Sequence, residues 1–101
     1  MRDGGNMQTK QITKAMKALS NPNRFKLFTE ISKISQSSYE KEECFVFDIM
    51  EKLNIGAPTV SHHLKELSNA DLITTERKGK YLVARVNKKM LKELSQVLNL
   101  K

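Results

Sequence analysis

Few residues in this chain could do covalent or metal chemistry, and three of them stand out. The 101 residues include one cysteine, Cys44, and two adjacent histidines, His62 and His63. The sequence contains no nucleophile paired with a base, no glycine-rich phosphate loop and no metal-hydrolase motif. We therefore expect no catalytic residues and no cofactor, and the protein is not expected to be an enzyme.

The two histidines and the cysteine do not form a metal-binding pattern. Adjacent residues on a helix point about 100° apart, so His62 and His63 cannot chelate one ion. We expect His62 to face outward and His63 to lie half-buried and bond locally. A soft-metal site needs several thiolates or imidazoles, so no metal site is predicted. Cys44 has no partner for an internal disulfide, and an inert thiol and a redox-switched thiol both remain open for it.

The charge of the chain points to an anionic partner. Lys and Arg number 18 and Asp and Glu number 11, which gives a net charge of +7. The excess is concentrated in residues 71–92, with seven basic and two acidic side chains. Such a cluster is typical of nucleic-acid binding, although a merely solvated face has the same composition.

The composition fits one small folded domain. Hydrophobic residues make up 39% and charged residues 29%, and no apolar run approaches the ~18 residues of a membrane-spanning helix. The first six residues carry no apolar run of a secretory signal. We therefore expect a cytoplasmic protein with a flexible arm over residues 1–7 and a single domain over residues 8–101.

Apolar spacings of three and four predict helices over residues 8–19, 24–34 and 44–53. A tight turn at residues 54–56 precedes another helix over residues 57–69, with Pro58 in its first turn. The predicted core is made of apolar residues from these helices: Phe25, Phe28, Ile31, Val46, Ile49, Leu53, Val60, Leu64 and Leu67. Phe45 and Phe47 are also simplest to explain as core.

From Leu72 onward the apolar period changes to two. Residues 72–86 therefore predict a β-hairpin whose basic tip is Lys78-Gly79-Lys80. Asn87 can cap a last helix over residues 88–99. The predicted fold is mainly helical, in the order α-α-α-α-β-β-α.

Two short helices joined by a three-residue turn, followed by a hairpin, have the order of a winged helix-turn-helix. If Val60, Leu64 and Leu67 face inward, the opposite face of the helix is polar and suits a DNA major groove. An ordinary amphipathic surface helix would have the same spacing.

Three segments resemble the ArsR-type (ArsR/SmtB) transcriptional repressors. Residues 18–28 (ALSNPNRFKLF) are similar to the family's ALxxPxRxxIL opening, and residues 58–67 (PTVSHHLKEL) to its recognition helix QPTVSRHLKVL. Residues 71–81 (DLITTERKGKY) resemble its strand and wing, GLVxxxRxGRxxxY. The resemblance implies a dimeric winged helix-turn-helix that binds an operator in double-stranded DNA and represses transcription.

The chain departs from the metal-sensing members of that family. Where many members carry ELCVCDL, this chain has ECFVFDI, so the two thiolate positions are Phe45 and Phe47. On a helix, Cys44 would point about 100° away from them. Residues 87–101 contain no Asp, His or Cys, and their only acid is Glu93. We therefore expect a repressor without the family's usual metal ligands.

The expected sites follow from this reading. The residues expected to contact DNA lie on the recognition helix and the wing: Ala57, Thr59, Ser61, His62, Lys65, Arg77, Lys78 and Lys80. The residues expected at a two-fold dimer interface form the apolar stripes of the terminal helices: Ile12, Met16, Leu19, Met90, Leu91, Leu94, Val97 and Leu98. A winged helix that binds another protein, and a repressor switched by a thiol at Cys44, are the alternatives.

Overall fold

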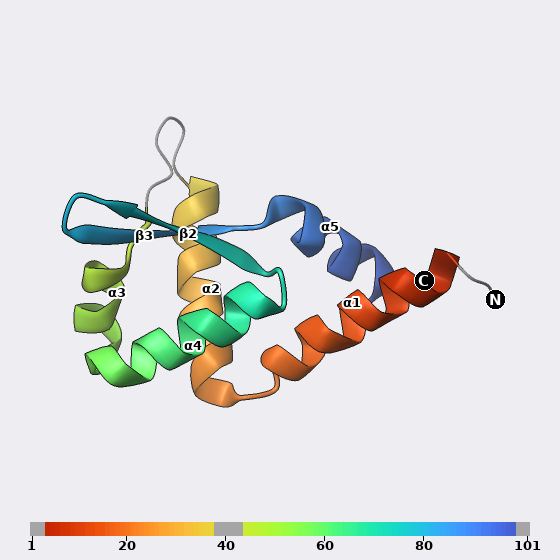
Figure 1. Cartoon of the computed structure of the whole chain (residues 1–101), viewed down its shortest axis with the longest axis horizontal. Coiled ribbons are helices and arrows are strands. Elements are labelled where there is room, and N and C mark those ends of the chain that lie inside the picture. Colours follow the sequence, from red (N-terminus) through yellow and green to blue (C-terminus); the bar gives the residue numbers. More distant parts are fainter. Residues whose placement is uncertain (1–3, 38–43, 99–101) are drawn as a thin grey trace.

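The computed structural model describes the backbone of residues 4–37 and 44–98, and the side chains of residues 9–34 and 45–98. Two helices come first, α1 (Gly4–Ala18) and α2 (Pro22–Ser37). A short strand β1 (Cys44–Phe45) leads into α3 (Val46–Leu53) and α4 (Ala57–Asn69). The hairpin strands β2 (Ile73–Lys78) and β3 (Tyr81–Val86) precede the last helix, α5 (Lys88–Val97) (Figure 1).

The predicted element order is confirmed, with β1 as an addition. The sheet has the order β1-β3-β2, and β1 pairs antiparallel with β3 through Cys44↔Ala84 and Phe45↔Val83. The predicted helix over residues 44–53 is therefore wrong for its first two residues, because a partner strand some 40 residues away satisfies their backbone groups. The helical angle of 100° expected at Cys44 does not apply either, since neighbouring strand residues point to opposite faces.

The ends of three other helices also differ from the expected positions. α2 spans Pro22–Ser37, where residues 24–34 were expected. α1 begins at Gly4, so the last part of the predicted arm over residues 1–7 is helical, and residues 1–3 lie outside the described part. Adding a turn to an existing helix costs little, because each further residue gains a hydrogen bond without a new nucleation step. α5 ends at Val97, and residues 99–101 lie outside the described part.

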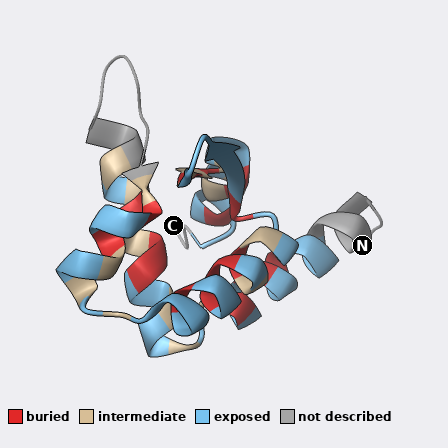
Figure 2. Ribbon diagram, turned by 60° about the vertical axis from the view of Figure 1, so that its left-hand side comes forward, coloured by how far each residue is buried: buried red, intermediate tan, exposed pale blue. Residues whose placement is uncertain are grey.

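One apolar core joins all five helices to the sheet (Figure 2). The largest fully buried side chains of the described residues lie on α2, α3, α4, the α4–β2 connection and the strands: Leu27, Ile31, Ile49, Leu67, Leu72, Ile73 and Val83. Three predicted core residues are not in this core: Phe25 and Phe47 are 49% and 55% exposed, and Phe45 on β1 is half-buried. Phe25 and Phe47 each lie on a helix whose inward stripe is already filled by other side chains, such as Phe28 on α2 and Ile49 on α3.

The start of α2 is fixed by two side chains. Oδ1 of Asn21 accepts hydrogen bonds from the backbone N–H groups of Asn23 and Arg24, both at 3.0 Å, and so caps the helix. The guanidinium of Arg24 donates to the carbonyl oxygen of Ala18 at 3.0 Å. The segment that resembles the family opening thus joins α1 to α2.

An ion-pair cluster joins α2 to the helix-turn-helix. Glu30 is buried, and its carboxylate accepts from Nζ of Lys52 on α3 at 2.9 Å and from Nζ of Lys33 at 3.4 Å. The hydrogen bond from Lys52 lowers the pKa of Glu30 despite the opposing effect of burial.

No helix in the described residues is long and apolar enough to cross a bilayer.

Candidate nucleic-acid interface

The turn between α3 and α4 forms where the sequence predicts it. Asn54 adopts the left-handed conformation, with φ 56°, and its N–H donates to the carbonyl of Glu51. Gly56 then precedes α4 in an extended conformation and makes no side-chain cap bond. Because no side chain occupies the first N–H groups of α4, they are available to an anion.

α4 has one buried face and one polar face. The buried residues are Val60, His63, Leu64 and Leu67. All five residues of this helix expected to contact DNA are exposed: Ala57, Thr59, Ser61, His62 and Lys65. The face directed away from the core therefore carries small or hydrogen-bonding side chains, as a helix in a major groove requires.

His63 lies deeper than the sequence suggested. The side chain was expected to be half-buried and to bond locally, but the residue is 6% exposed and its Nδ1 has no hydrogen-bond partner in the described part of the chain. Burial is the main cause that lowers the pKa of His63, and the positive charge of Arg24 acts in the same direction. The helix packing that buries Leu64 and Leu67 also buries this ring, which single-helix periodicity does not show.

The hairpin presents three exposed cations near its tip. Lys78 pairs with Tyr81, which leaves Gly79 and Lys80 as a two-residue loop, and Gly79 has φ 63°. A glycine tolerates this positive φ at no steric cost. Arg77, Lys78 and Lys80 are all exposed. Figure 1 shows this tip and the N-terminal end of α4 at the same end of the molecule.

A further cation of the hairpin, Arg85, forms an ion pair within the hairpin itself. The guanidinium of Arg85 forms an ion pair with Glu76 at 2.7 Å. Its charge is therefore partly neutralised within the hairpin.

Asn87 lies between the hairpin and α5 and bonds in both directions. Its Oδ1 accepts from the N–H of Met90 at 3.2 Å, which confirms the predicted helix cap. Its Nδ2 donates to the carbonyl of Asp71 at 2.8 Å, and its own N–H donates to the carbonyl of Leu72 at 2.9 Å. The start of α5 is thus attached to the segment that links α4 to β2.

The expected dimer residues divide into three groups, which are buried, partly buried and exposed. Ile12, Met90 and Leu94 are buried within the single chain, so their expected availability for a partner is wrong. They belong to the same core cluster as Ala15 on α1. Leu19 and Leu91 are partly buried, whereas Met16, Val97 and Leu98 are exposed.

Sequence reasoning missed an aromatic group beside the wing. The rings of Phe45 and Tyr81 meet edge to face, with centroids 5.8 Å apart, and Nζ of Lys80 lies 5.8 Å from the Tyr81 centroid. The exposed Phe47 lines the same hollow as Tyr81. Phe45 and Phe47, at the family's thiolate positions, offer no donor to a metal, and no group of three or more potential metal ligands occurs among the described residues.

Comparison with known proteins gives a consistent result. A family model described as "Bacterial regulatory protein, arsR family" matches residues 39–75, which include α3 and α4. The arsenical resistance operon repressor of Staphylococcus xylosus is 28% identical over 94 residues, which are 93% of this chain and 83% of that protein. The transcriptional repressor SdpR of Bacillus subtilis is 29% identical over 82 residues, 81% of this chain and 82% of that protein.

The fold is also that of solved structures. The homodimeric winged helix-turn-helix DNA-binding domain of Mb0332 from Mycobacterium bovis, described as a possible ArsR-family transcriptional regulator, superposes with a TM-score of 0.72 at 19% identity. The match covers 96% of this chain and 83% of that one. Over the helix-turn-helix the chain is thus similar to the arsR family of bacterial regulatory proteins, over most of its length it is similar to curated repressors, and its fold is that of a winged helix-turn-helix.

Proposed function

We propose that the protein acts in the cytoplasm as a homodimeric, sequence-specific repressor that binds a near-palindromic operator in double-stranded DNA. One observation carries this proposal. The N-terminal end of α4 and the basic hairpin tip lie at one end of the molecule, and α1 and α5 lie toward the other (Figure 1). A two-fold axis through the terminal helices would then leave α4 and the hairpin tip of both protomers free to contact DNA.

In this proposal α4 reads bases from the major groove. Thr59, Ser61 and His62 contact base edges, and the small side chain of Ala57 permits a close approach or a contact with a thymine methyl group. Lys65 lies near a phosphate, and the uncapped N-terminus of α4 donates backbone N–H groups to another. Burial of the opposite face of α4 supports this orientation.

The wing supplies charge rather than sequence recognition. Arg77, Lys78 and Lys80 contact the backbone or the adjacent minor groove. Contacts of this kind strengthen binding to every DNA sequence.

The homodimer has support from the exposed residues of the terminal helices. Met16, Val97 and Leu98 remain uncovered in the single chain, and they lie on α1 or at the end of α5. The related domain of Mb0332 is described as homodimeric. We further propose that no metal bound at the positions of Phe45 and Phe47 controls DNA binding, since neither side chain can ligate one.

Selection of bound fragments from a genomic library would identify the operator, and fluorescence anisotropy would then measure affinity over a range of salt concentrations. Replacing Lys80 with Glu should weaken binding to operator and unrelated DNA alike and reduce the salt slope by about 1. Lys14→Glu on α1 makes the same change of charge at the other end and should leave the slope unchanged.

Two results would contradict the proposal. Equal slopes for wild type and Lys80→Glu would show that the wing does not touch DNA. Binding that does not depend on salt would indicate a protein-binding module instead, because contacts with several phosphates always give a steep dependence.

A further inference from the structure

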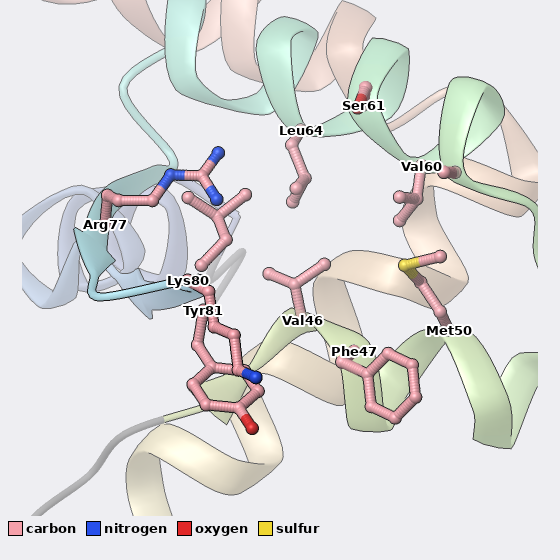
Figure 3. Close-up of a pocket in the computed structure, with 11 residues that line it drawn as sticks. Val46, Phe47, Met50, Val60, Ser61, Leu64, Arg77, Lys80 and Tyr81 are labelled. Atoms are coloured by element: carbon pink, nitrogen blue, oxygen red, sulfur yellow. The ribbon is translucent and has the colours of Figure 1, made fainter.

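A cavity of about 430 Å³ lies between α3, α4 and the hairpin (Figure 3). This volume falls within the range of small-molecule sites. Its apolar lining comes from all three elements: Phe47, Met50, Val60, Leu64, Tyr81 and Leu82. The described residues that line it include two cations, Arg77 and Lys80, and no acid.

The rim of this cavity exposes aromatic surface to water. Phe47 is 55% exposed and Tyr81 is 48% exposed, although burial of such a side chain would be favourable. Figure 3 shows both rings on the same side of the cavity, with Leu64 and Val60 on the opposite side. The Tyr81 ring also makes an edge-to-face contact with Phe45. A flat apolar group between these sides would cover surface that the chain leaves exposed.

The cations determine which polar group such a ligand would carry. Figure 3 shows the guanidinium of Arg77 extending from β2 toward α4 above the apolar lining. Neither Arg77 nor Lys80 makes a salt bridge within the described part of the chain, and Nζ of Lys80 lies 5.8 Å from the Tyr81 centroid. A guanidinium binds a carboxylate through two parallel hydrogen bonds. The lining therefore complements an aromatic ring that bears one carboxylate.

We propose that this cavity binds a small aromatic carboxylate, and that the bound ligand displaces DNA. The second part rests on the proposed function. Ala57 and Ser61 on α4, together with Arg77 and Lys80 on the wing, line the cavity and are also proposed DNA contacts. A ligand that pairs with Arg77 removes that cation from the phosphate, so ligand and operator compete for the same groups.

Isothermal titration calorimetry on the DNA-free protein tests the cavity, with 2-naphthoate as the probe and neutral 2-naphthamide as its uncharged match. We expect saturable binding of one naphthoate per chain and at least tenfold weaker binding of the amide. Phe47→Ala should raise the Kd of naphthoate at least tenfold. Phe25→Ala removes an equally exposed phenylalanine on α2 and should change the Kd less than twofold.

Three outcomes would overturn the cavity assignment. They are no binding of naphthoate at millimolar concentration, equal binding of the amide, and equal effects of the two phenylalanine variants. Far-UV circular dichroism checks that each variant is folded. Phe47→Leu, which keeps an apolar side chain, should give a Kd between those of wild type and Phe47→Ala.

Anisotropy with labelled operator tests the competition. Naphthoate at ten times its own Kd should raise the apparent Kd for operator about 100-fold, because the sites of both protomers must be empty when the dimer binds DNA. Operator binding that is insensitive to naphthoate, with calorimetric binding intact, would overturn the regulatory part alone. Calorimetric binding without any affinity for DNA would instead contradict the proposed function and leave the cavity assignment standing.

Discussion

Replacing Leu98 with Glu should convert the proposed dimer into a monomer at micromolar concentration. Leu98 is the C-cap residue of α5, and 56% of its surface is exposed in the single chain. The change therefore places a carboxylate in the proposed interface and leaves the core of each protomer intact. Leu94, one turn earlier, is 5% exposed, so Leu94→Glu would destabilise the protomer itself and does not isolate the interface.

The size of the effect follows from the exposed fractions. Full burial of a Leu, Val or Met side chain contributes about 1.5–3 kcal/mol. Met16, Val97 and Leu98 are 45%, 46% and 56% exposed, so covering them on both protomers contributes roughly 4–9 kcal/mol before the cost of association. The two copies of Leu98 account for about 1.7–3.4 kcal/mol of this free energy. Their loss should raise the dimer Kd by roughly 15- to 300-fold.

Sedimentation equilibrium measures this change directly. The wild type should sediment at twice the chain mass of 11.6 kDa, and Leu98→Glu should approach the mass of a single chain and lose operator affinity. Phe25→Glu makes the same kind of change at an exposed site on α2 and should remain dimeric. A wild type that sediments as a monomer, or a Leu98→Glu variant with the dimer Kd of the wild type, would refute the reasoning.

Three further predictions concern stability. Asn87→Ala should lower the free energy of unfolding in urea by about 1 kcal/mol or more, since it removes a helix cap and a second hydrogen bond. Because burial lowers the pKa of His63, the unfolded chain binds more protons, so the free energy of unfolding should fall as pH drops below about 6.5, and His63→Leu should reduce that slope. Glu30→Gln should destabilise the protein at neutral pH, because Lys52 lowers the pKa of Glu30, and the difference from wild type should vanish as pH falls through that lowered pKa.

Matched variants separate these effects from general disruption. His62→Leu, on the exposed face of α4, should keep the pH dependence that His63→Leu reduces. Lys33→Met tests the longer of the two ion pairs of Glu30 and should destabilise less than Lys52→Met. An Asn87→Ala variant as stable as the wild type, or equal pH profiles for wild type and Glu30→Gln, would contradict the corresponding prediction.

Features set by neighbouring residues could be predicted from the sequence. The turn at Asn54, the break before Pro22 and the cap at Asn87 depend on residues whose local hydrogen bonds or backbone angles favour them. The alternation on both sides of Gly79 likewise predicts the hairpin. The outward face of α4 could also be predicted, because Val60, Leu64 and Leu67 recur at the helical period and together mark one inward face.

Features that depend on distant partners could not be predicted in the same way. β1 exists because Cys44 and Phe45 pair with β3, and nothing in residues 44–53 alone distinguishes them from a first helical turn. Phe25 and Phe47 are apolar residues on amphipathic helices, but packing of the helices onto one another leaves them outside. The burial of Met90 likewise depends on how α5 packs against the common core.

The bonds of Asn87 have a consequence for the spacing of DNA sites. They hold the start of α5 against the α4–β2 connection, so in the proposed dimer the angle between the two reading helices has little freedom to adjust. One base pair inserted between half-sites turns the second by about 35° and moves it by about 3.4 Å. Two recognition helices held in this way can bind half-sites at one spacing only. If the spacing changes, the DNA must bend or twist to bring both half-sites into contact.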